Sequence, residues 1–139
     1  MKAALAAIAC LLAAGAAAPA AQDFPGLSLR DQREQDDSAR RLADEVAYTA
    51  SVCGAPIKSS IDRRSLSNWP AFADLVSACD GALGAVEASC RAGRTGLVRE
   101  FVCAGDGSGA KLKGGVLRYG AAPTSDGFAQ TKPVLDAAR

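Results

Sequence analysis

A glycine-rich stretch near the C-terminus carries the pattern of a phosphate-binding loop. Residues 105–110 read Gly-Asp-Gly-Ser-Gly-Ala, which matches the G-x-G-x-x-G/A motif that holds the pyrophosphate of a dinucleotide. Such a loop needs a helix directly after it, because the helix N-terminus faces the phosphates. Residues 111–119, KLKGGVLRY, contain two adjacent glycines and β-forming residues instead. We therefore interpret the stretch as a β-hairpin turn, with no nucleotide cofactor.

The chain contains no histidine, which excludes several kinds of active site at once. Ser-His-Asp and Cys-His catalysis need an imidazole, and so does the motif that attaches a c-type haem. Asp106 and Ser108 offer oxygens for calcium, but the other carboxylates of a calcium loop are missing. We expect no metal, no cofactor and no enzymatic activity. The alternative is a small hydrolase or transferase that uses serine or carboxylate chemistry, with Ser108 as the candidate serine, although a nucleophile still needs an activating base.

The first 20 residues have the composition of a secretory signal peptide. Lys2 precedes an apolar run rich in alanine and leucine, and residues 18–20 read Ala-Pro-Ala, which places small residues where a signal peptidase cleaves. The apolar run is too short for a transmembrane helix, and no later segment is a candidate. We therefore expect an exported protein, periplasmic or extracellular, with a single domain over residues 21–139.

Charge is balanced over the expected mature chain but unevenly distributed along it. The full sequence has 16 basic and 15 acidic residues, so removal of Lys2 leaves 15 of each. Residues 23–52 carry 7 acidic and 4 basic residues, a net charge of −3, whereas residues 91–118 carry 6 basic and 2 acidic residues, a net charge of +4. Neutrality overall, and the lack of aromatic residues among the basic ones, argue against nucleic-acid binding.

Hydrophobic spacing predicts two long helices. The first begins near Ser28 and ends at Gly54, and the second begins near Ser67 or Asn68 and ends at Gly93. The expected buried stripe of the first helix is Leu42, Val46, Thr49 and Cys53. The expected stripe of the second helix is Phe72, Leu75, Val76, Cys79, Leu83, Val86 and Cys90.

A C-terminal β-hairpin and a short final helix complete the predicted α+β fold. Residues 96–105 and 110–120 are expected to form the two paired strands, and the final helix is expected to start near Lys132. The two long helices are predicted to be antiparallel, as in a helical hairpin. Gly81 and Gly84 lie within the second helix, where each costs up to about 1 kcal/mol relative to alanine. We expect these small residues to let another backbone approach closely, with a partner-binding groove as the alternative.

Cys53, Cys79, Cys90 and Cys103 remain after export, and an even number of cysteines in an oxidising compartment indicates two disulfides. Cys79 and Cys90 lie on one helix about 16 Å apart along its axis, which is too far for a bond between them. Two pairings stay open. In a helical hairpin the end of the first helix lies nearer to Cys79, so we favour Cys53–Cys79 with Cys90–Cys103 over Cys53–Cys90 with Cys79–Cys103.

A set of positions between Cys79 and Tyr119 resembles small secreted bacterial proteins of unknown function that contain cysteines. The matching positions are Cys79, Ala82, Leu83, Glu87, Cys90, Cys103 and the segment LKGGVLRY at 112–119. The resemblance implies the same helix-plus-hairpin arrangement and the same cysteines, and it transfers no activity.

Four basic residues of the expected hairpin form the candidate binding site: Arg99, Lys111, Lys113 and Arg118. Together they can bind a carboxylate, a phosphate or an acidic protein. The simpler interpretation is a set of solvated edge-strand charges, because lysine on an edge strand also prevents unwanted strand pairing. We expect an envelope protein that binds or inhibits a protein partner through these basic residues or through a helix face, and the alternative is a purely structural envelope component.

Overall fold

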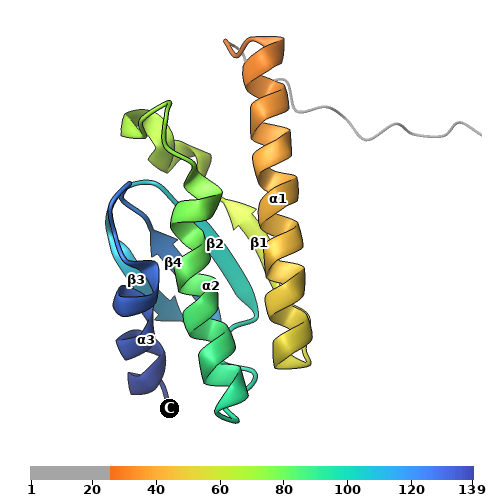
Figure 1. The fold of residues 1–139 in the computed structure, drawn as a ribbon, viewed down its shortest axis with the longest axis vertical. Helices are drawn as coiled ribbons and strands as arrows, with labels where there is room; N and C mark the ends of the chain where they lie inside the picture. Colours follow the sequence, from red (N-terminus) through yellow and green to blue (C-terminus); the bar gives the residue numbers. More distant parts are fainter. Residues whose placement is uncertain (1–25) are drawn as a thin grey trace, which may run out of the picture.

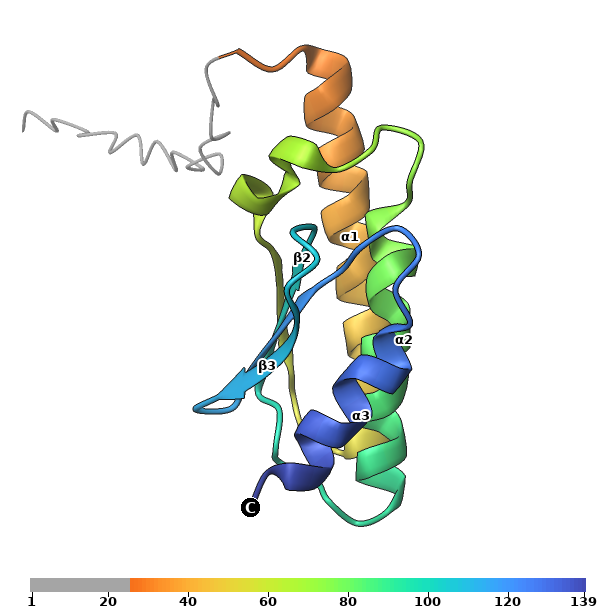
Figure 2. The same cartoon turned by 90° about the vertical axis from the view of Figure 1, so that its left-hand side faces the viewer.

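Three helices cover one face of a four-stranded sheet (Figures 1 and 2). The computed structural model describes residues 26–139, and the expected signal peptide lies outside them. The elements in chain order are α1 (Leu29–Cys53), β1 (Lys58–Ile61), the 3₁₀ helix η1 (Arg63–Asn68), α2 (Leu75–Arg91), β2 (Glu100–Ala104), β3 (Gly109–Lys113), β4 (Val116–Gly120) and α3 (Gly127–Ala137). The α+β class is as predicted. No helix of the described residues is long and apolar enough to cross a membrane.

Helix α1 begins and ends where the sequence predicts. The Ser28 hydroxyl accepts a hydrogen bond from the Asp31 N–H at 3.1 Å, and the Asp31 carboxylate accepts one from the Ser28 N–H at 3.2 Å. This reciprocal pair satisfies donors that a helix N-terminus otherwise leaves free. Gly54 ends the helix with φ 69°, a left-handed conformation that glycine adopts without strain. The predicted stripe of Leu42, Val46, Thr49 and Cys53 is buried.

The two long helices are parallel, and the prediction that they are antiparallel is wrong. The reason is strand β1, which follows α1 and pairs in parallel with β2. This strand carries the chain back along α1, so that α2 starts at the same end of the molecule as α1 and runs in the same direction (Figure 1). A parallel strand pair needs a long crossover connection, and here η1 and α2 provide it.

Helix α2 begins later than predicted. Asp74 caps its N-terminus by accepting hydrogen bonds from the N–H groups of Val76 and Ser77, and Leu75 is the first helical residue. The expected start near Ser67 lies in η1, because the Asp74 cap competes successfully with the earlier serine and asparagine. Phe72, expected on the buried stripe, precedes the helix and has 91% of its surface exposed.

Helix α3 also differs from the prediction at its first turn. It begins at Gly127 rather than near Lys132, because Asp126 caps it by accepting a hydrogen bond from the Ala129 N–H at 2.9 Å. Pro133 consequently lies inside the helix.

The sheet is mixed, with strand order β1-β2-β4-β3. The predicted hairpin between residues 96–105 and 110–120 is wrong, since the second segment folds back on itself as β3 and β4. Gly114 and Gly115 have φ values of 58° and 79°, which two-residue hairpin turns of type I′ require, and they join these antiparallel strands. Strand β4 therefore lies between β2 and β3, parallel to β2. The glycine-rich loop at residues 105–108 crosses the end of β4.

The disulfides join Cys53 to Cys90 and Cys79 to Cys103, with Cα–Cα distances of 5.0 and 6.0 Å. The favoured pairing of Cys53–Cys79 with Cys90–Cys103 is therefore wrong, and the second of the two open pairings is present. The cause is the parallel arrangement of the helices: Cys53 and Cys90 both lie near the C-terminal ends of their helices, and these ends lie side by side (Figure 1). The exclusion of a bond between Cys79 and Cys90 is consistent with this pairing.

Close packing explains Gly81 of α2, as predicted, but not Gly84, where a Cβ would meet only Phe128 Cδ2 at 3.7 Å, an ordinary van der Waals contact. A Cβ on Gly81 would lie 3.0 Å from the Phe128 backbone nitrogen, and a Cβ on Gly127 would lie 2.8 Å from the Ala82 nitrogen. The backbones of α2 and α3 thus touch where both carry glycine, and α3 can cover this part of α2 only because these side chains are absent.

Peptide mapping without reduction distinguishes the two disulfide pairings. Cleavage after lysine, arginine and glutamate separates all four cysteines, because Glu87 lies between Cys79 and Cys90. Mass spectrometry should find peptide 46–58 joined to 88–91. A mass for 46–58 joined to 65–87 would contradict the structure.

Both disulfides should contribute strongly to stability. They join residues 24 and 37 positions apart, and the entropy that such loops remove from the unfolded chain corresponds to about 3.5 and 4 kcal/mol. Urea unfolding of Cys79→Ala/Cys103→Ala and of Cys53→Ala/Cys90→Ala should show losses of this size in the free energy of unfolding. A loss below about 1 kcal/mol would show that the unfolded chain gains little conformational entropy when that disulfide is removed.

Candidate functional site

The sheet has one face against the helices and one face that they leave uncovered (Figure 2). Side chains alternate along a strand, so the burial of Phe101, Cys103, Leu117 and Tyr119 places their neighbours on the opposite side. The strand register aligns these neighbours in two rows. We call them the open face, and they are Lys58, Glu100, Val116 and Lys113 in one row, and Ser60, Val102, Arg118 and Lys111 in the other.

Three lysines of the open face have no internal partner. Lys58, Lys111 and Lys113 are exposed, and none of their side-chain ammonium groups makes a hydrogen bond or ion pair with any other residue between 26 and 139. Glu100 is the only acidic residue in the two rows, and it too makes no ion pair within the described chain. The ammonium groups are therefore available to a ligand.

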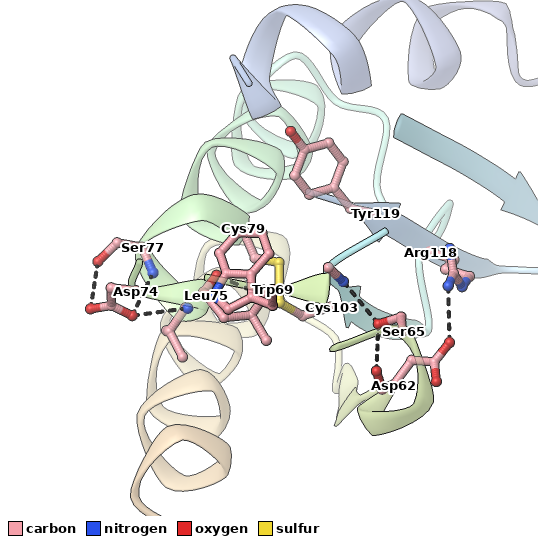
Figure 3. The surroundings of a disulfide bond; sticks show 12 residues. Asp62, Ser65, Trp69, Asp74, Leu75, Ser77, Cys79, Cys103, Arg118 and Tyr119 are labelled. Atoms are coloured by element: carbon pink, nitrogen blue, oxygen red, sulfur yellow. Dashed lines mark hydrogen bonds and ion pairs between the residues drawn. A yellow bond between two sulfur atoms is a disulfide. The ribbon is translucent and has the colours of Figure 1, made fainter. Parts of the chain in front are cut away.

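Arg118 has a different environment, because its guanidinium is held by two carboxylates. Its Nη2 lies 2.9 Å from Asp62 Oδ2 and 2.7 Å from Asp106 Oδ2, and its Nη1 donates to Ser108 Oγ at 3.0 Å. Figure 3 shows the contact with Asp62. The hydrogen bond from Arg118 is the main cause of an Asp106 pKa well below the ordinary value, and Ser108 contributes further. These contacts join the end of β1 to the loop that crosses β4.

Arg99 lies at the hairpin turn. Its Nη2 donates to the Gly114 carbonyl at 3.0 Å, and its guanidinium occupies the space that a side chain at Gly115 would need. The structure therefore brings the four predicted basic residues to the half of the sheet that contains β3 and β4, but it leaves only Lys111 and Lys113 without internal contacts. Lys58 belongs to the same face and was not predicted, because its strand went unrecognised.

The glycine-rich loop does not offer a phosphate site. A phosphate cradle needs free backbone N–H groups, but three N–H groups of this loop are occupied. Gly105 donates to Ser65 Oγ at 2.8 Å, Gly107 to the Ala121 carbonyl at 2.9 Å, and Ser108 to Asp106 Oδ1 at 3.1 Å. The Asp106 carboxylate would also repel an anion. The loop closes the end of the sheet.

Ser108 is not placed as a nucleophile. Ser108 and Lys111 stand in Ser-x-x-Lys order, a spacing that can serve serine nucleophiles with a lysine base. Here Ser108 lies in the loop, where its hydroxyl contacts Arg118, and a guanidinium does not take up a proton at neutral pH. Lys111 makes no hydrogen bond to Ser108, so the pair lacks the contact that would activate the hydroxyl.

Two clefts lie on the helical side of the molecule, with volumes of about 630 and 620 Å³. The first lies between α1 and the Trp69 region, and Arg41 forms a 2.7 Å ion pair with Asp74 at its edge. Burial raises the pKa of Asp74, but hydrogen bonds from Arg41 and Ser77 outweigh it, so the net shift is downward. The second lies between α2 and residues 123–127. The described residues contain no group of three or more potential metal ligands, in these clefts or elsewhere.

No family model, curated protein or solved structure matches the chain. Its function is therefore inferred from its own residues, and the open face is the strongest candidate because it combines exposure with unpaired charge.

The Asp106–Arg118 contact makes stability depend on pH. The pKa of Asp106 is lower in the folded protein than in the unfolded chain, where it is about 4. The ionised carboxylate therefore contributes fully to the free energy of unfolding above about pH 4, and this contribution is lost as the pH falls below that value. Urea unfolding should show that Asp106→Asn is less stable than the unmodified protein at pH 7 and that the difference shrinks between about pH 4 and pH 2.

Asp36→Asn is the matched control for this experiment. It removes an exposed carboxylate of α1 that has no hydrogen bond in the described part of the chain. Its stability should follow that of the unmodified protein at each pH. An Asp106→Asn difference that stays constant across the range would mean that the carboxylate charge is unimportant.

Proposed function

We propose that the chain is an exported protein without enzymatic activity that binds an acidic protein partner on the open face of its sheet. The observation that carries this proposal is the set of three exposed, unpaired lysines on a face that no helix covers: Lys58, Lys111 and Lys113. The two disulfides fit a protein that works in an oxidising compartment.

Charge separation across the molecule favours an acidic partner in a defined orientation. Outside the Arg118 contacts, the open face has three positive charges and one negative charge, a net charge of +2, and Arg118 with its two carboxylates lowers this to +1. Helix α1 lies in the other layer (Figure 2) and has six acidic and four basic residues, a net charge of −2. Such a distribution attracts an acidic surface to the sheet side and repels it from α1.

The centre of the open face is suited to contact as well as to attraction. Val102 on β2 and Val116 on β4 are half-buried and lie diagonally to each other in the sheet. Val116 lies between Glu100 and Lys113, and Val102 lies between Ser60 and Arg118. An apolar centre with a polar rim is the usual composition of a protein interface. Binding at this face would bury the two valines and place acidic groups of the partner beside the lysines.

Charge reversal on β3 tests the proposal. The probe is a fluorescently labelled short peptide of alternating glutamate and valine, and its anisotropy is measured at low and physiological salt. Lys111→Glu/Lys113→Glu should weaken binding about tenfold or more, because each exchange replaces an attraction by a repulsion. Binding by the unmodified protein should also weaken as salt rises.

The matched control is Arg33→Glu/Arg40→Glu, which changes the net charge by the same amount on exposed positions of α1. It should change the affinity less than twofold. Equal losses in both variants would indicate a response to net charge alone, and the absence of binding by the unmodified protein would refute the proposal.

A further inference from the structure

Strand β3 forms one edge of the sheet and has unused backbone groups. It pairs only with β4, and the order β1-β2-β4-β3 leaves its other side without a strand. The Gly114–Gly115 turn makes Lys113 and Val116 the closing hydrogen-bonded pair, so bonding alternates from there along β3. The N–H and C=O groups of Ala110 and Leu112 therefore point away from β4. Figure 2 shows β3 at the front of the sheet, with α3 beside it.

The two sides of β3 differ in chemistry. Lys111 and Lys113 are exposed and lie on the open face. Ala110 and Leu112 point toward the helical layer, where they are partly buried against the core. A strand added at this edge would have its side chains divided in the same way.

We infer that the β3 edge binds an extended segment of the acidic partner as an additional strand of the sheet. The inference rests on the proposed function and names its binding mode. The segment fits when acidic residues alternate with apolar or small ones, because every second side chain then lies beside Lys111 and Lys113 while the others lie beside Ala110 and Leu112. Backbone hydrogen bonds supply affinity in such complexes, and the alternating side chains supply specificity.

Lys111 and Lys113 favour an acidic segment at this edge, and they do not block strand addition in general. Their side chains stand on the sheet face, so they leave the outward backbone groups of Ala110 and Leu112 accessible. Two lysines on alternate residues would repel a second copy of β3, since like charges on neighbouring strands are destabilising. An acidic strand turns that repulsion into attraction. The other edge strand, β1, has one lysine. Only β3, of the two edge strands, therefore offers two lysines on alternate residues to an acidic strand.

Amide hydrogen exchange, followed by NMR, tests the binding mode directly. With the alternating glutamate and valine peptide at saturation, exchange at Ala110 and Leu112 should slow about tenfold or more, because their N–H groups become hydrogen-bonded. Amides of β1 at the far edge should change less than twofold. Binding without protection at Ala110 and Leu112 would overturn the inference and leave the proposed function standing, whereas no binding at all would overturn both.

The variant Ala110→Pro distinguishes the contribution of backbone hydrogen bonds at the β3 edge from that of the lysine charges. Proline removes an N–H that points away from the sheet, a position where edge strands tolerate it, and it keeps both lysines. Thermal unfolding should confirm that the variant is folded, and its affinity for the peptide should fall about tenfold. The same peptide N-methylated on alternate residues should lose affinity for the unmodified protein to a similar extent. Unchanged affinity in either experiment contradicts strand addition.

Discussion

The parallel pairing of β1 with β2 determines where the helices lie. Parallel neighbours cannot be joined by a tight turn, so the chain must leave β1, cross the sheet and re-enter at the same end. Helix α2 makes that crossing, and the Cys79–Cys103 bond holds it to β2. Because α1 runs parallel to α2 on the same side, the helical layer is complete on one face, and the other face stays uncovered (Figure 2).

Local chemistry made α1 predictable, while the direction of α2 relative to α1 was not. Ser28 and Gly54 are strong signals for the two ends of a helix, and both act as predicted. The buried stripes Leu42, Val46, Thr49, Cys53 and Cys79, Leu83, Val86, Cys90 have identical spacing. Two matching stripes can pack in either direction, and only the connection between them decides. That connection contains β1, whose four residues include two serines and give no strong strand pattern.

The sequence predicted which basic residues form the site, but not which of them have ion-pair partners. Sequence places Lys111, Lys113 and Arg118 within one short segment, but it does not show which of them have partners. Asp62 lies far from Arg118 in the chain and reaches it because β1 and β4 both flank β2. Lys58 was missed for the same reason, since its position on the open face depends on β1. Contacts between distant segments thus decide which charges are free.

The carboxylates around Arg118 also explain how the sheet tolerates so basic a hairpin. The Gly114–Gly115 turn sets Lys111 directly opposite Arg118, and like charges in that position destabilise an antiparallel pair. The negative charges of Asp62 and Asp106, both paired with Arg118, oppose this repulsion without contacting Lys111. The hairpin can then keep its two lysines without ion-pair partners in the folded protein. The same arrangement leaves β3 at the edge, where a partner can reach both its lysines and its backbone.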